Sequence, residues 1–175
     1  STGDATGLLE LLERIKIRFE ASDGGVWLGE DEVSTELRQE AAGTLASEVA
    51  VVPAVRQALL ARQHQFRQLP GLVADGRDMG TVVFPDAIVK VFLTASPQER
   101  ANRRYKQLIA KGIDVNLSAL FLDIKARDER DSNRAVSPLK PADDAIVVDT
   151  TDLSIEQVVA TVLELVRRRM PIADN

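Results

Sequence analysis

The sequence contains no cysteine and only one histidine, His64. The lack of cysteine excludes disulfides, thiolate metal sites and a cysteine nucleophile, and a single histidine excludes a multi-histidine metal site. No apolar run reaches the roughly 18 residues that a membrane span requires, and no signal-peptide pattern is present. These absences predict a cytoplasmic protein with no membrane partner and no metal ion held by its own side chains.

Positive charge is also in short supply. The chain has 22 Lys and Arg against 27 Asp and Glu, a net charge of −5. General nucleic-acid binders are usually basic, so we expect no nucleic-acid partner. The charge is uneven, however, because residues 100–134 carry nine Lys and Arg against five Asp and Glu, a local charge of +4. A basic patch on an acidic protein favours a small anionic ligand over a long polyanion.

The composition is that of a folded domain, with 45% hydrophobic and 28% charged residues. Residues 8–13 predict a helix, and residues 15–21 alternate between apolar and polar, which predicts a half-buried strand. Residues 26–28 follow turn-forming glycines and predict the second strand of a hairpin. Two amphipathic helices should follow, the first capped by Ser34 and the second carrying Pro53 in its first turn.

Three short apolar runs occupy the rest of the chain, at residues 72–74, 88–95 and 145–148. Runs of this kind are typical of parallel strands buried on both faces. Between and after them, Ser96 and Ser154 each open a helical segment with an N-terminal capping pattern. Strands that alternate with helices predict an α/β fold, a parallel sheet with flanking helices, in addition to the small antiparallel hairpin.

Asp75-Gly76-Arg77-Asp78 directly follows the first of these predicted strands. In α/β sheets, ligands bind beyond the carboxyl ends of the strands, and glycine lets a backbone approach a ligand closely. Arginine grips phosphate through two parallel hydrogen bonds. The equally weighted alternative is a polar turn with a surface ion pair.

Residues 71–78 nearly match the phosphate-binding pattern G-x-x-x-x-G-K-[ST], but the match fails on chemistry. Asp78 stands where a hydroxyl should hold Mg²⁺, and Arg77 stands in place of the lysine. No other segment of the sequence matches this pattern.

Arg127, Asp131 and Arg134 are spaced at i, i+4 and i+7, which places all three on one helix face. Two cations that flank one carboxylate have the chemistry to bind a phosphate and a sugar hydroxyl together. Spacing alone favours the alternative, a solvated face with ordinary ion pairs.

Arg100, Arg103 and Arg104 lie early in the helix that follows Ser96. Cations at this end of a helix oppose the macrodipole, which prefers anions there. This conflict hints at a functional role, although a surface face is the simpler interpretation.

Two of these segments are similar to a known family. Residues 72–87 resemble the central signature of bacterial cytidylate kinases, and residues 127–134 resemble the lid segment of the same family. The likeness covers nearly the whole chain from about residue 28. It implies a P-loop-kinase-like α/β fold, in which residues 1–70 form the CMP-binding insert with its hairpin. Residues 71–175 would be the remainder of the core domain, including a lid at about residues 105–135.

The resemblance implies roles in base and donor recognition for four residues. Ser47, Arg56 and Asp78 correspond to groups that recognise cytosine. Arg103 matches a position that faces ATP.

It also implies a group of residues around the CMP phosphate. Arg77 and Arg134 correspond to phosphate ligands, and Arg127 and Asp131 to lid residues that meet the phosphate and sugar. Arg77, Arg127 and Arg134 would therefore be the catalytic arginines, which suits a reaction that depends on positioning and on charge stabilisation.

The implied activity is transfer of a phosphoryl group from ATP, accompanied by Mg²⁺, to CMP or dCMP. The implied partners are these small nucleotides alone, on a parent protein that is monomeric. Members of this family begin with a strand, a P-loop and a helix, which this sequence does not contain. We therefore expect a fragment that is inactive alone. Two alternatives stay open, a catalytically inactive CMP-binding fragment and a kinase for another nucleoside monophosphate.

Overall fold

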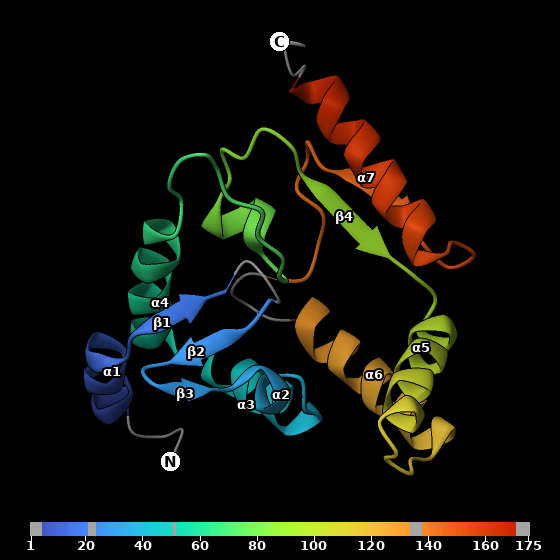
Figure 1. Cartoon of the computed structure of the whole chain (residues 1–175), viewed down its shortest axis with the longest axis horizontal. Coiled ribbons are helices and arrows are strands. Elements are labelled where there is room, and N and C mark those ends of the chain that lie inside the picture. Colours follow the sequence, from blue (N-terminus) through green and yellow to red (C-terminus); the bar gives the residue numbers. More distant parts are fainter. Residues whose placement is uncertain (1–4, 21–23, 51, 134–137, 171–175) are drawn as a thin grey trace. The chain divides into compact units, whose positions relative to one another are not determined.

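A computed structural model describes residues 5–20, 24–50, 52–133 and 138–170 (Figure 1). The chain divides into two compact units, Ser1–Val73 and Ala74–Asn175. Among the described residues, no helix combines the length and the apolar composition that crossing a membrane would require. The prediction that the first part is a CMP-binding insert and the second a core domain with a lid stays a prediction.

In the first unit, the described residues form a small antiparallel sheet and four helices. Strands β1 (Ile17–Phe19), β2 (Val26–Leu28) and β3 (Asp31–Glu32) pair in the order β1-β2-β3, with Ile17 opposite Leu28. The helices are α1 (Ala5–Arg14), α2 (Ser34–Leu37), α3 (Glu40–Val49) and α4 (Pro53–Gln65). The predicted hairpin is confirmed, because alternating residues of β1 meet a return strand across a glycine-containing turn.

Helix α4 holds both α1 and the hairpin. Arg62 of α4 donates hydrogen bonds to the carbonyl oxygens of Leu12 and Ile15, which lie at and just beyond the last turn of α1. Carbonyls at a helix end have no partner within the helix, so this arginine satisfies them. At the end of α4, the ring of Phe66 meets that of Phe19 of β1 edge to face, with centroids 5.2 Å apart.

The prediction that Ser34 caps a single helix is wrong. Its buried hydroxyl instead accepts a hydrogen bond of 2.8 Å from the backbone N–H of Val26, across the hairpin. The amphipathic segment that follows is interrupted after Leu37, so it forms α2 and α3 rather than one helix. Pro53 does occupy the first turn of α4, as its fixed φ favours.

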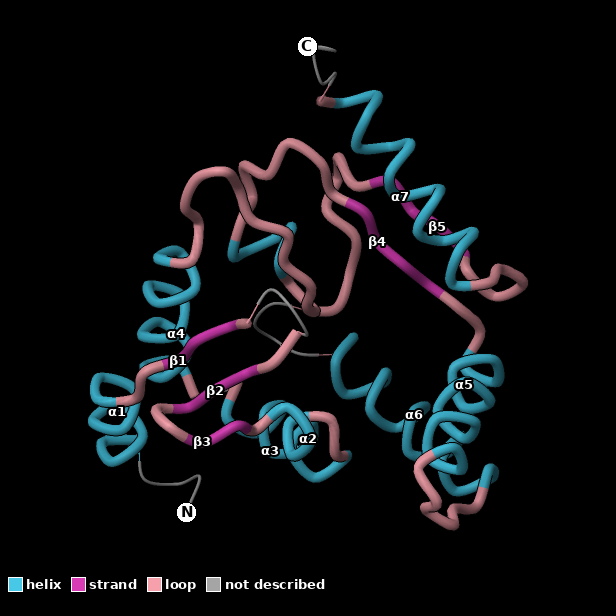
Figure 2. Tube along the Cα trace, in the orientation of Figure 1, coloured by secondary structure: helices cyan, strands magenta, loops and turns pink. Residues whose placement is uncertain are grey.

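In the second unit, the described residues form a pair of parallel strands and three long helices, whose traces can be followed in Figure 2. Strands β4 (Val91–Thr94) and β5 (Ile146–Asp149) pair in parallel, from Val91 opposite Ile146 to Thr94 opposite Asp149. The helices are α5 (Pro97–Ala110), α6 (Leu117–Ser132) and α7 (Ile155–Arg169), preceded by a short π-helix, η1 (Met79–Val83). The predicted combination of a parallel sheet, helices and an antiparallel hairpin is therefore confirmed.

Two details of the predicted sheet are wrong. Residues 72–74 form no strand, and the side chain of Val73 is fully exposed, because no neighbouring strand pairs with this segment in the described structure. The strand pair is also not buried on both faces, since Leu93 and Val147 are each more than half exposed. Short apolar runs become strands only where a ladder partner satisfies their backbone.

Both predicted helix starts are confirmed. Ser96 accepts a hydrogen bond of 3.2 Å from Glu99 N–H, and Ser154 forms a complete capping box with Gln157. Helix α5 leaves the end of β4 almost directly and runs beside α6 as an antiparallel pair (Figure 1).

A half-buried lysine closes the N-terminal end of the β4–β5 pair. Lys90 Nζ donates to the carbonyl oxygen of Pro85 at 2.6 Å and to the two carboxylate oxygens of Asp144 at 2.9 and 2.8 Å. These hydrogen bonds hold the pKa of Asp144 below its ordinary value. Because Lys90 immediately precedes β4 and Asp144 lies just before β5, the contact joins the two strands where they begin.

Candidate functional site

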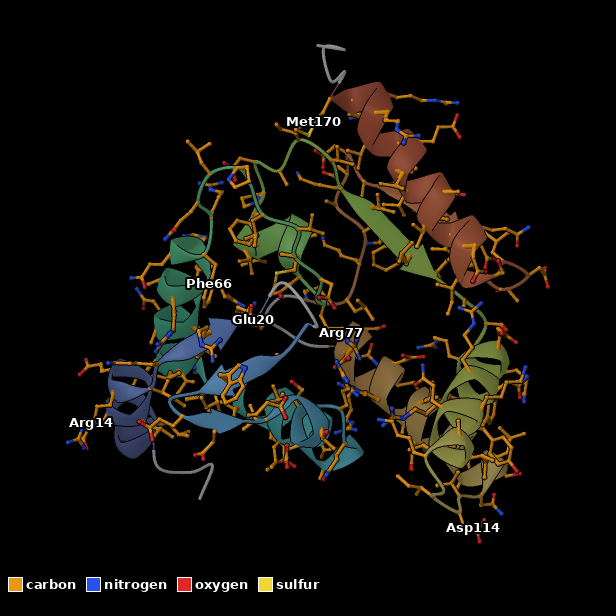
Figure 3. The ribbon with its side chains drawn as sticks, viewed as in Figure 1. Arg14, Glu20, Phe66, Arg77, Asp114 and Met170 are labelled. Carbon is orange, nitrogen blue, oxygen red and sulfur yellow. The ribbon has the colours of Figure 1, made fainter. Side chains whose placement is uncertain are left out.

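The most deeply buried charge in the described structure is Asp131, near the end of α6. Its carboxylate is only 1% exposed, and Arg77 Nε donates a hydrogen bond of 2.7 Å to Oδ2. Arg127 lies one turn earlier on α6, with its Nε 4.0 Å from the same oxygen. Figure 3 shows Arg77 beside this end of α6. The interpretation of residues 127–134 as a solvated face is therefore wrong for Asp131.

Local structure on both sides holds this cluster, which consists of Arg77, Arg127 and Asp131. The spacing of four residues places Arg127 and Asp131 on one face of α6. Arg77 belongs to the turn before η1, where the neighbouring Gly76 packs against Met79. A Cβ at residue 76 would lie 2.9 Å from Met79 Cε, so a larger residue would require the end of the Met79 side chain to move.

The cluster has the chemistry of an oxyanion site. A buried carboxylate is tolerated only when it is paired, and here two guanidinium groups compensate one negative charge, which leaves one net positive charge. The side chain of Arg77 is 42% exposed, so a dissolved anion can reach it. Guanidinium groups bind both carboxylate and phosphate groups through paired N–H donors, so the cluster has the chemistry to bind an anion of either kind.

A second ion pair joins α5 to α6 directly beside the cluster. Arg100 Nη1 donates to Asp128 Oδ1 at 2.8 Å, and Nη2 donates to Oδ2, so the contact is bidentate. Hydrogen bonding to Asp128 raises the pKa of Arg100 above its ordinary value. The position of Arg100 near the start of α5, against the helix macrodipole, was the one indication of this pair in the sequence. Nothing in the sequence indicated that Asp128 is its partner.

Arg103 joins α5 to the C-terminal ends of the strands. Its Nη1 donates to Thr150 Oγ1 at 3.0 Å, its Nη2 donates to the carbonyl oxygen of Thr150, and its Nε donates to Glu99 at 2.9 Å. Thr150 was not identified from the sequence, although it follows an apolar run of the kind that ends at a sheet edge. A role for Arg103 toward ATP stays a prediction.

The other predicted site residues lie in several elements. Asp78 is half-buried, and its carbonyl oxygen accepts hydrogen bonds from Val82 and Val83 of η1. Ser47 is part of α3 and Arg56 is a half-buried residue of α4, both in the first unit. Arg134 lies outside the described residues. The structure thus brings Arg77, Arg127 and Asp131 together, and the roles of all these residues stay predictions.

Comparison with known proteins gives consistent matches over most of the chain. A family model described as Cytidylate kinase matches residues 1–168. A cytidylate kinase of Pseudomonas aeruginosa (strain UCBPP-PA14) is 58% identical over 163 residues, which are 91% of this chain and 71% of that protein. The cytidylate kinase of Cupriavidus pinatubonensis is 55% identical over 161 residues (92% and 72%), and that of Klebsiella pneumoniae is 54% identical over 168 residues (95% and 74%).

Proposed function

Because this chain belongs to the cytidylate kinase family, we propose that it serves as a nucleoside monophosphate kinase acting on CMP. The reaction transfers the γ-phosphoryl group of ATP to CMP or dCMP and gives ADP with CDP or dCDP. A phosphate oxygen of the acceptor forms the new P–O bond, while the bond between the γ-phosphorus and the bridging oxygen of ATP breaks. The relatives' names favour this acceptor over those of other nucleoside monophosphate kinases.

The observation that supports the proposal most directly is the cluster of Arg77, Arg127 and Asp131. Phosphoryl transfer requires two anionic groups to meet in line, so the acceptor phosphate must be held and its charge offset. Arg77 and Arg127 both approach the buried carboxylate of Asp131, and its negative charge reduces the repulsion between the two guanidinium groups. The pair can therefore present positive charge to an anion. We assign Arg77 and Arg127 to the acceptor phosphate and Asp131 to their orientation and to a sugar hydroxyl.

The remaining assignments belong to the same proposal. They place Ser47, Arg56 and Asp78 at the cytosine ring, Arg134 at the phosphate and Arg103 toward ATP. Mg²⁺ would enter with ATP and offset the charge of its phosphates. Among the described residues, no group of three acidic or histidine side chains gathers as a metal site. The P-loop-kinase-like fold class, a monomeric parent and a cytoplasmic location are part of the proposal too.

Calorimetric titration of the chain with CMP, cytidine and AMP tests the acceptor site. We expect CMP to bind at least about tenfold more tightly than cytidine, because the phosphate adds charge-assisted hydrogen bonds. Equal affinity for CMP and cytidine would contradict the assignment of Arg77 and Arg127. Tighter binding of AMP than of CMP would point to a kinase for another nucleoside monophosphate.

A coupled assay of ADP formation tests the transfer itself. CMP-dependent ADP formation supports the kinase. CMP binding without ADP formation would identify the chain as a catalytically inactive CMP-binding fragment.

A further inference from the structure

We infer that Arg100, Asp128, Arg103 and Thr150 form a brace that positions Arg127 and Asp131 for the acceptor phosphate. These four residues are positioning residues, since they act on the phosphate through α6. The inference rests on the proposed function, and it adds residues to which neither the family resemblance nor the motifs gave this role.

The first half of the brace fixes α5 to the strand ends. Thr150 is 5% exposed, and both its backbone N–H (2.8 Å) and its hydroxyl (3.0 Å) donate to the carbonyl oxygen of Thr94, the last residue of β4. Arg103 of α5 then donates to the hydroxyl and the carbonyl oxygen of this threonine. The ends of β4, β5 and the first turns of α5 are therefore tied through one buried residue.

The second half fixes α6 to α5. A bidentate pair between a guanidinium and a carboxylate has a defined plane, unlike a contact to a single point charge. The pair of Arg100 and Asp128 therefore restricts both the axial position and the rotation of α6.

The position of Asp128 on α6 connects the brace to the site. Asp128 adjoins Arg127 in sequence and precedes Asp131 by three residues, less than one helical turn. A shift of α6 by one residue would rotate its side chains by about 100° and turn Asp131 away from Arg77. Holding Asp128 in place therefore holds Arg127 and Asp131 at the position where Arg77 meets them.

Stability alone explains the pair of Arg100 and Asp128 poorly. Arg100 lies in the first turns of α5, where the macrodipole disfavours a cation. Its Nε is buried and has no hydrogen-bond acceptor among the described residues. Partly buried ion pairs often contribute little net stability, because desolvation offsets their attraction. The position of this bidentate pair directly beside the cluster is better explained by the geometry that it imposes on α6.

The test measures CMP and cytidine affinity by NMR titration of the chain and of three variants. Arg100→Lys keeps the charge but loses the bidentate geometry, and Asp128→Asn keeps the shape but loses the charge. Arg168→Lys is the matched control, because Arg168 pairs with Glu164 on α7 while both side chains are more than half exposed. We expect about tenfold weaker CMP binding for the first two variants, cytidine affinity unchanged within about twofold, and no change for the control.

Each other outcome overturns a specific part of the argument. If Asp128→Asn strengthens CMP binding, Arg100 contacts the phosphate directly and Asp128 only competes for it, so the brace is wrong. Equal losses for CMP and cytidine would show a merely structural role, and unchanged CMP affinity in both variants would also reject the brace. If the unsubstituted chain binds CMP no better than cytidine, the proposed phosphate site fails, and the brace fails with it.

Discussion

The two ends of the β4–β5 pair are both closed by a cation, but the cations differ. At the N-terminal end, the ammonium group of Lys90 reaches Pro85 and Asp144. At the C-terminal end, the guanidinium group of Arg103 reaches Glu99 and Thr150. An ammonium group is a compact point charge, whereas a guanidinium group is planar and directional.

The partners of these cations differ as well. Asp144 is 60% exposed, so the lysine contact ends at the protein surface. Thr150 is 5% exposed, and α5, the helix that Arg103 fixes there, also carries Arg100, which pairs with Asp128 of α6. The comparison indicates that the N-terminal contact serves local stability, while the C-terminal contact also supports the cluster of Arg77, Arg127 and Asp131.

The largest effect on stability and on CMP affinity should come from removing the carboxylate of Asp131, which lies at the centre of the cluster. Asp131→Ala removes the carboxylate that Arg77 and Arg127 share. We expect a loss of about 2 kcal/mol in the free energy of unfolding, below the range for fully buried pairs because Arg77 remains partly hydrated. CMP affinity should fall by about 30-fold or more.

Urea denaturation and CMP titration measure these two quantities for the Asp131→Ala variant. Undiminished CMP affinity would show that the two arginines do not depend on Asp131 for their orientation.

Thr150→Val tests the contact at the C-terminal end of the β4–β5 pair, because valine has nearly the same shape as threonine but no hydroxyl group. The variant removes a buried hydroxyl that accepts from Arg103 and donates to Thr94. We expect a loss of about 1–2 kcal/mol in the free energy of unfolding, because polar partners are left unsatisfied. A small decrease in CMP affinity, about threefold, should accompany it through the brace.

The matched control for Thr150→Val is Thr161→Val on α7, where the hydroxyl donates to the carbonyl oxygen of Gln157 one turn earlier. This control should change the free energy of unfolding by less than about 0.5 kcal/mol. If Thr161→Val lowers the free energy of unfolding as much as Thr150→Val does, the burial of the Thr150 hydroxyl adds nothing to its contribution to stability.

Lys90→Met tests the N-terminal end in the same way. The side chain of Lys90 is 8% exposed, and methionine can fill its place without donating hydrogen bonds. We expect a loss of about 1 kcal/mol in the free energy of unfolding, since the exposed Asp144 returns to water at little cost. CMP affinity should not change. If Lys90→Met weakens CMP binding as much as Thr150→Val does, the functional difference between the two ends does not exist.

The sequence predicted the parts of the fold that local rules determine. The alternation in residues 15–21, the serine caps at Ser96 and Ser154 and the apolar run before Asp149 each produce the expected element. Local rules failed where a distant group decides the outcome. The Ser34 hydroxyl is taken by Val26 of the hairpin, and residues 72–74 lack the neighbouring strand that would make them a strand.

The candidate site shows the same limit. The approach of Arg127 to Asp131 follows from helical spacing, but Arg77 is 54 residues from Asp131 and could be connected with it only through family resemblance. The pair of Arg100 and Asp128 spans 28 residues between two helices. Periodicity gives the face of each helix but not the register of one helix against another, so this pair could not be predicted.

The smallest effect concerns pH and isolates the lysine contact. The pKa of Asp144 is lowered in the folded state, chiefly by its hydrogen bonds to Lys90. A carboxyl group with a lowered folded-state pKa stabilises the fold above its unfolded pKa of about 3.9, and this contribution is lost as the pH falls through the folded-state value. The stability difference between the unsubstituted chain and Asp144→Asn should therefore be present at pH 7 and should decrease once the pH falls below about 4.

Urea denaturation at several pH values measures this difference, with Asp152→Asn as the control for an exposed carboxylate. Added salt should reduce the difference, because Asp144 faces solvent and its attraction to Lys90 is screened. A difference that persisted unchanged to pH 3 would mean that the charge of Asp144 contributes nothing. The N-terminal contact would then depend on the hydrogen bond from Lys90 to Pro85 alone, and the contrast between a charge-dependent end and a geometry-dependent end would have to be abandoned.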